Sequence, residues 1–146
     1  MPNWCYTDIN IECNSEKEAK ALYDKINKWT SVNYRKNDFG LNWLGNIVGN
    51  SGLDSMNDRG DFSVRCRGSL IYLDMNENGD EIVVSTETAW CPMLQMWKLI
   101  CQIYLPSGYD IKYSAEETGW GLYETNIQEL IYDEEKFEYV AVEEQE

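Results

Sequence analysis

The chain has 146 residues, of which 43% are hydrophobic and 13% aromatic, and its formal net charge is −14 without any histidine. This length and aromatic content indicate one folded domain with a sizeable core rather than a disordered chain. The charge disfavours direct binding to a nucleic-acid backbone or to an anionic membrane, because such binding depends on lysine and arginine. The lack of histidine excludes imidazole-based catalytic triads and histidine metal ligands.

The first half of the chain contains a strand, a helix and a long irregular segment. Residues 5–13 alternate between two faces, and this period of two predicts a half-buried strand. Ser15 opens a capping-box sequence, and the apolar stripe that follows predicts a helix ending near Trp29. Residues 30–68 are rich in Asn and Gly, and we interpret them as a loop-rich insertion with a short helix near 41–48.

The next two elements are a hairpin and a second long helix. Strands are predicted over 69–75 and 82–87, because the Asn-Gly dipeptide ending at Gly79 supplies the positive φ angles of a tight turn. Pro92 fits the first position of a helix that runs to about Tyr104.

The last third of the chain is predicted to add further strands. Residues 109–115 alternate again, and the segments 126–132 and 136–142 are two more extended candidates. The predicted fold class is α+β: a ferredoxin-like β-α-β-β-α-β sandwich with an antiparallel sheet and extra C-terminal β-structure. We expect residues 1–146 to form this single domain.

Carboxylates are concentrated in the C-terminal part of the chain. Residues 116–146 hold eleven of them against one base, Lys136, a net charge of −10, whereas the preceding residues have a net charge of −4. Apolar residues are interleaved with these acids, so we expect residues 116–142 to be an acidic extension that packs on the body. The candidate partner-binding residues are the carboxylates Glu116, Glu117, Glu124, Asp133, Glu134, Glu135 and Glu138.

Other candidate sites are weaker. Residues 74–80 match the first half of a calcium loop, but Ser85 stands where a bidentate glutamate is needed, which favours a polar hairpin turn. The loop and turn carboxylates leave open a small metal-dependent hydrolase or transferase; they are Asp58, Asp61, Asp74 and Asp80. We assign no catalytic residue, no metal ligand and no cofactor.

Arginines and aromatic residues give two further hypotheses. Arg65 and Arg67, together with Lys112, form a possible small basic spot on the sheet, for which neutralisation of the acidic tail is the simpler role. Tryptophans and tyrosines cluster in the second half of the sequence and are more often core than site, although an exposed tryptophan beside an acidic surface would resemble an interaction hot spot. These aromatic residues are Trp90, Trp97, Trp120 and Tyr123.

The five scattered cysteines contain no Cys-x-x-Cys pair, which favours reduced thiols in a cytoplasmic protein. The N-terminus has no basic region leading into an apolar run, and no apolar stretch approaches the ~20 residues of a membrane span. We therefore expect a cytoplasmic location and no membrane partner.

Three short motifs resemble those of a known family. They lie near the N-terminus, at the predicted start of the helix that runs to about Tyr104, and after residue 117. They are Asn3, Trp4 and Cys5; Thr88, Ala89, Trp90 and Pro92; and Gly119, Trp120 and Gly121. In combination they resemble the YubB ferredoxin-like family of phage and plasmid proteins, over roughly residues 1–29 and 82–125. The resemblance implies a ferredoxin-like fold and a mobile-element origin, and it implies no reaction.

The charge and the resemblance together predict a non-enzymatic interaction protein of a phage or mobile element, acting in the bacterial host cytoplasm. We expect it to bind a basic surface of a host nucleic-acid-handling or defence protein as an inhibitor, by nucleic-acid mimicry in the manner of an anti-CRISPR protein. The metal-dependent enzyme remains one alternative, and a structural homo-oligomerisation module is another. The oligomeric state stays open.

Overall fold

The computed structural model describes residues 4–35, 39–117, 122–125, 130–133 and 138–141. They form a mixed α+β protein with a five-stranded antiparallel sheet, three helices and a separate two-stranded sheet, which confirms the predicted α+β class. In chain order the elements are β1 (Trp4–Cys13), α1 (Glu16–Trp29), α2 (Leu44–Asn50), β2 (Gly68–Met75), β3 (Glu81–Ala89), α3 (Gln95–Tyr104), β4 (Tyr109–Glu117), β5 (Leu122–Thr125), β6 (Leu130–Asp133) and β7 (Glu138–Ala141).

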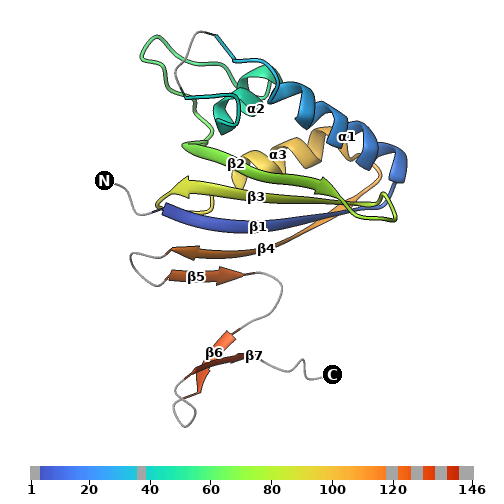
Figure 1. Ribbon diagram of the computed structural model, residues 1–146, viewed down its shortest axis with the longest axis vertical. Coiled ribbons are helices and arrows are strands. Elements are labelled where there is room, and N and C mark those ends of the chain that lie inside the picture. The colour runs from blue at the N-terminus through green and yellow to red at the C-terminus, as the bar shows by residue number, and fades with distance from the viewer. Residues whose placement is uncertain (1–3, 36–38, 118–121, 126–129, 134–137, 142–146) are drawn as a thin grey trace.

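The large sheet has the strand order β2-β3-β1-β4-β5, with α1 and α3 on one side of it (Figure 1). β1 lies at the centre, and its Ile9 is paired with Val84 of β3 and with Tyr113 of β4. Ile9 and Ile11 are fully buried, while Asp8, which precedes Ile9, is exposed. The predicted alternation of β1 is therefore confirmed, and it assigns one face of the sheet to the core.

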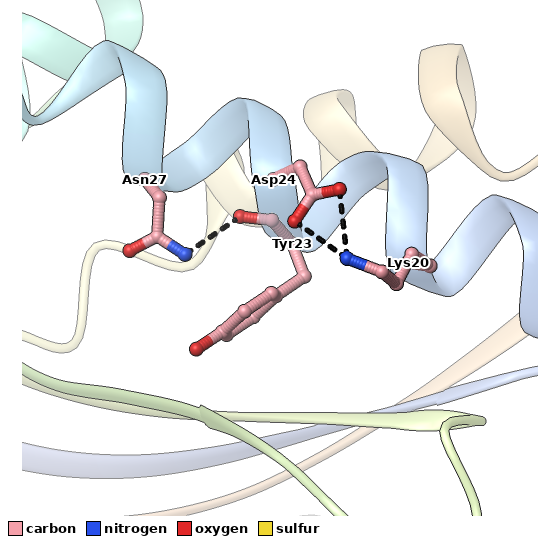
Figure 2. A network of polar contacts seen from close by, with 4 residues as sticks. All are labelled: Lys20, Tyr23, Asp24 and Asn27. Carbon is pink, nitrogen blue, oxygen red and sulfur yellow. Dashed lines mark hydrogen bonds and ion pairs between the residues drawn. The ribbon is translucent and has the colours of Figure 1, made fainter.

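Helix α1 begins where the capping box predicts. The Oγ atom of Ser15 accepts a hydrogen bond from the backbone N–H of Glu18 at 3.2 Å. The helix buries one stripe against the sheet, consisting of Ala19, Leu22, Ile26 and Trp29. Its outer surface has mixed charge: Lys20 Nζ donates to both carboxylate oxygens of Asp24 at 3.0 Å (Figure 2).

Helix α3 begins later than the sequence predicts. Its first residue is Gln95, so the prediction that Pro92 occupies the first helical position is wrong. The preceding residues form an irregular turn in which Trp90 has φ +74° and Met93 has φ +55°. Both values lie outside the helical region, and they delay the helix. Of the described residues, no helix is long and apolar enough to cross a membrane.

The segment between α1 and β2 is organised by buried polar contacts. Asn46 of α2 is fully buried, and its Oδ1 accepts from the backbone N–H of Tyr34 at 2.8 Å. Its Nδ2 donates to the carbonyl oxygens of Gly40 at 3.0 Å and Leu41 at 3.1 Å. A backbone bridge between Trp43 and Ser69 then joins the segment to the edge of β2. A single short helix and a few amide contacts thus hold this Asn- and Gly-rich stretch in place.

β2 and β3 form the predicted hairpin, and Gly79 has φ +75° in its turn. Gly68, at the start of β2, lies against Thr88 with its α-carbon so close to β3 that an added Cβ would stand 2.2 Å from the carbonyl oxygen of Glu87. Only glycine fits there without displacing the backbone.

The C-terminal strands differ from the predicted ones. β5, which the sequence patterns did not predict, extends the large sheet by pairing with β4. β6 and β7 pair with each other as a two-stranded sheet. β6 overlaps the predicted segment 126–132 and ends one residue beyond it, and β7 falls within the predicted segment 136–142. Residues 126–129, 136, 137 and 142 of those segments lie outside the described residues. The packing of this acidic extension on the body stays a prediction.

Candidate functional site

The structure distributes the predicted partner-binding carboxylates over both faces of the large sheet. Glu116 is paired with Tyr6 and is exposed on the face away from the helices. Glu117 is paired with Cys5 on the covered face and is only 5% exposed. Glu124 is exposed beside β4, where its Oε1 accepts from the hydroxyl of Tyr113 at 2.7 Å. Glu116 and Glu117 therefore cannot belong to one continuous surface.

The remaining predicted carboxylates lie further along the chain. Asp133 ends β6 and is paired with Glu138 at the start of β7. Glu134 and Glu135 lie outside the described residues. The acidic surface that the structure describes is therefore chiefly that of the large sheet.

The face of the large sheet away from the helices carries many carboxylates from strands that are distant in sequence. Glu12 lies between Glu81 and Asp110, and Tyr6 lies between Glu87 and Glu116. We call this surface the acidic sheet face and define it by Asp8, Glu12, Asp74, Glu81, Glu87, Asp110 and Glu116. Strands β1 to β5 contain one base, Lys112. Cross-strand neighbours lie about 4.5–5.5 Å apart at Cβ, so these charges are dense.

Polar contacts hold several of these carboxylates in position. Lys112 Nζ lies 3.1 Å from Glu12 Oε1, and this hydrogen bond, with the attraction of Glu12 and of nearby Asp110, raises the pKa of Lys112. The hydroxyl of Ser85 donates to Asp8 Oδ1 at 2.7 Å. Lys112 thus pairs with Glu12 on the acidic sheet face, whereas Arg65 and Arg67 line a separate cleft, so the three do not form the predicted basic spot.

A second feature is a cleft of about 740 Å³ at the end of the sheet where β1 and β2 begin and β3 ends. Its walls come from those strands, from residues 60–67, and from Phe39 and Trp43 just before α2. We call it the aromatic cleft and define it by its five aromatic and two basic lining residues, Trp4, Phe39, Trp43, Phe62, Trp90, Arg65 and Arg67. Its volume lies within the ~300–1,000 Å³ typical of small-molecule sites.

Aromatic rings in the cleft contact one another in a row. The ring centroids of Phe39 and Trp43 are 4.6 Å apart, and those of Trp43 and Phe62 are 6.0 Å apart. Tyr34 continues the row, at 5.6 Å from Phe62. The outer rings remain open to solvent, since Phe39 is 66% exposed and Trp90 52% exposed.

The two arginines of the cleft are available to a ligand. Arg65 and Arg67 are exposed, and neither forms an ion pair with a carboxylate in the described part of the chain. The nearest polar contact of Arg65 is a long one, 4.0 Å from Nη1 to the sulfur of Cys91. In a chain of net charge −14, two such guanidinium groups beside one cleft are unexpected.

Trp90 reaches the cleft through a strained turn. The backbone N–H of Cys91 donates to the carbonyl oxygen of Ala89 at 2.9 Å, and Trp90 between them has φ +74°. This is a γ-turn of the rare positive-φ form, which bulky residues seldom adopt. The buried Thr88 closes the turn by donating its hydroxyl to the carbonyl oxygen of Cys91 at 2.5 Å.

The structure brings together two of the motifs on which the family resemblance rests. Trp4 is paired with Ala89, and Cys5 with Thr88, so the N-terminal motif and the turn before α3 meet at the cleft. Pro92 is buried beside them. Four motif residues lie outside the described residues: Asn3, Gly119, Trp120 and Gly121.

The remaining sequence candidates have ordinary structural surroundings. Trp97 is fully buried in the core, whereas Trp90 is exposed. The side chain of Tyr123 is not among those described. Asp80 Oδ1 accepts from Asn76 at 2.8 Å inside the hairpin turn, and Asp74 Oδ2 accepts from Tyr72 at 2.8 Å. In the described ranges no group of three or more acidic or cysteine side chains is arranged to hold a metal ion.

The cysteines are not paired with one another in disulfides. Burial raises the pKa of the Cys66 and Cys101 thiols to about 12, and burial together with the nearby Asp80 raises that of Cys13 to about 11. These thiols stay protonated at neutral pH and are poor nucleophiles.

Sequence reasoning did not find the aromatic cleft. Phe39, Trp43 and Phe62 are scattered through an Asn- and Gly-rich segment whose path no periodicity predicts. The available signal was the pair of arginines following aromatic residues in a segment too long for a plain connection.

No family model matches this chain, and no curated protein or solved structure matches it. The resemblance to the YubB family stays a prediction that rests on the motif residues. The candidate functional surfaces of the described chain are the acidic sheet face and the aromatic cleft.

Proposed function

We propose that this protein is a non-enzymatic binding protein whose acidic sheet face docks on a basic surface of a bacterial nucleic-acid-handling or defence protein and inhibits it. The observation that carries the proposal is the concentration of seven carboxylates and one lysine on one open face of a sheet. Such a face offers fixed negative charges where a phosphate backbone would otherwise bind.

The sheet supplies the rigidity that this mode of binding needs. The carboxylates project from hydrogen-bonded strands whose other face is packed on α1 and α3, so little ordering is required on association. Opposite charge on the partner would raise the association rate and make the complex sensitive to salt.

Tyr6 provides a central anchor for the same surface. It is 44% exposed and lies between Glu87 and Glu116. An exposed tyrosine surrounded by charged residues has the composition of an interface hot spot.

We also propose the finer fold assignment and a mobile-element origin. The element order of the described chain, with strand order β2-β3-β1-β4, is that of a ferredoxin-like split β-α-β sandwich, and residues 30–68 would then be an insertion between α1 and β2. The carboxylates of the acidic extension, Asp133 and Glu138 among them, would add negative charge for the same partner. A mobile-element inhibitor would act in the host cytoplasm.

The test is a defence assay in bacteria that express the protein while a CRISPR or restriction system targets an incoming plasmid. The native chain should raise the number of transformants, and the variant E87Q/E116Q should lose this effect. E16Q/E77Q is the matched control, because it removes the same charge from an exposed position on α1 and from the exposed turn between β2 and β3, neither of which is part of the acidic sheet face as defined. Equal protection by both variants would contradict the proposal.

A further inference from the structure

We propose that the aromatic cleft binds a small aromatic anion, namely a nucleoside monophosphate. The base would lie among the aromatic rings and the phosphate on the two arginines. This inference is independent of the acidic sheet face, because none of the residues that line the cleft belongs to the set that defines that face.

The apolar side of the cleft suits a planar ring. Trp43 contacts both Phe39 and Phe62, and Trp90, which directly follows β3, lines the same cleft. Aromatic faces stack on nucleobases with little dependence on base identity, with a gain in affinity of about tenfold or more per stacked base.

The charged side of the cleft suits one phosphate group. Arg65 and Arg67 are two residues apart just before β2, and both line the cleft without a carboxylate partner in the described ranges. The planar guanidinium group forms paired hydrogen bonds with phosphate oxygens. Asp61 also lines the cleft and can accept from a ribose hydroxyl or an exocyclic amino group.

The walls of the cleft are held before any ligand arrives. The carbonyl oxygen of Arg67 accepts from the N–H of Ala89 at 3.0 Å. Asp54 Oδ2 accepts from the N–H groups of Ser63 at 2.6 Å and Val64 at 3.1 Å, which fixes the chain just before Arg65. A site built in this way loses little conformational freedom on binding.

The strained turn at Trp90 is the second, independent observation. Trp90 has the unfavourable backbone angle φ +74° although its side chain is 52% exposed. Burial of the indole ring therefore does little to offset the cost of this conformation. Such outliers cluster at functional sites, where the surrounding structure imposes them. Here the imposed geometry places an indole ring at a cleft lined by two arginines, neither of which forms an ion pair within the described residues.

The experiment is a titration of the full chain with AMP, GMP, CMP and UMP, followed by tryptophan fluorescence and by isothermal calorimetry. Inorganic phosphate and adenosine are separate arms that test the anionic and aromatic halves alone. We expect saturable binding of a nucleotide, weaker by about tenfold or more for adenosine and for phosphate. Absence of a heat and of a fluorescence change with all four nucleotides at millimolar concentration would overturn the proposal.

Variants locate the site. R65Q/R67Q should weaken nucleotide binding by about tenfold to a hundredfold, because two charge-assisted contacts are lost. K98Q, an exposed charge on α3 that does not line the cleft, is the matched control and should bind as the native chain does. W90L tests the aromatic half separately, with folding checked by circular dichroism. Equal affinity of native chain, R65Q/R67Q and W90L would also overturn the proposal.

Discussion

The hydroxyl of Thr88 donates a hydrogen bond to the carbonyl oxygen of Cys91 at 2.5 Å, and this contact closes the turn that displays Trp90. Thr88 is fully buried on the covered face of β3. Thr86, two residues earlier on the same face, is equally buried, but its Oγ1 has no hydrogen-bond partner in the described part of the chain. The two threonines therefore offer a matched pair of substitutions.

T88V should lower the free energy of unfolding by about 1–3 kcal/mol, because it leaves the carbonyl oxygen of Cys91 without its donor. T86V should leave stability unchanged or raise it by about 1 kcal/mol, because it replaces an unsatisfied buried hydroxyl by a methyl group. Urea denaturation of both variants measures the difference. Similar losses in both would mean that the contact does not hold the turn.

W90G tests the strain in that turn. Glycine adopts φ +74° freely, so the variant should gain up to about 1 kcal/mol from the backbone, partly offset by lost contacts of an exposed side chain. We expect a midpoint of thermal unfolding equal to or above that of the native chain, together with loss of nucleotide binding. A large drop in the midpoint would show that Trp90 serves packing instead.

G68A should destabilise the fold by more than about 2 kcal/mol, since its methyl group would stand 2.2 Å from the carbonyl oxygen of Glu87. G52A is the control: Gly52 has φ +76° with open space around it, so only the backbone penalty of about 1–2 kcal/mol applies. Denaturant midpoints compare the two. A cost for G68A no larger than that for G52A would contradict the close approach of β2 to β3.

Asp54 should make the free energy of unfolding depend on pH in the acidic range. Burial opposes ionisation, but hydrogen bonds from the N–H groups of Val64, Ser55 and Ser63 outweigh it and lower the pKa of Asp54 below its ordinary 3.8. A lowered pKa means that its stabilisation is present above pH 3.8 and is lost as pH falls through the folded-state value. D54N should therefore be less stable than the native chain near pH 6, and the gap should close below pH 3.8. A gap independent of pH would argue against an ionised Asp54.

Lys112 should stabilise the acidic sheet face by reducing repulsion around Glu12. K112Q should lower the unfolding midpoint at low salt, and the loss should shrink in about 0.5 M NaCl as screening weakens the repulsion. K98Q again serves as control, with the salt response of the native chain. Thermal unfolding at two salt concentrations distinguishes these outcomes.

Local patterns predict the elements, and pairing register decides the surfaces. The period of β1 and the cap at Ser15 follow from near neighbours in sequence, so both were predictable. The start of α3 was not, because Pro92 is compatible with a helix start and the positive φ of Trp90 depends on Thr88. Proline at a first helical position is a local preference that a tertiary contact overrides here.

Neither surface could be located from sequence. Glu12, Glu81 and Asp110 are far apart in the chain, and only the antiparallel register makes them neighbours. A shift of one residue would move each set of side chains to the opposite face. The net charge of the C-terminal part therefore predicted a binding role for Glu117, which is buried, and no such role for Asp8 and Glu87.

The most direct test of the proposed function is capture of a bacterial partner by immobilised protein, measured at low and at high salt. The native chain and the control E16Q/E77Q should retain the same basic, nucleic-acid-handling protein at low salt and release it as salt rises. Removal of two charges from the acidic sheet face in E87Q/E116Q should weaken this binding by about 2- to 30-fold. Undiminished binding by E87Q/E116Q would contradict the assignment of the acidic sheet face as the docking surface.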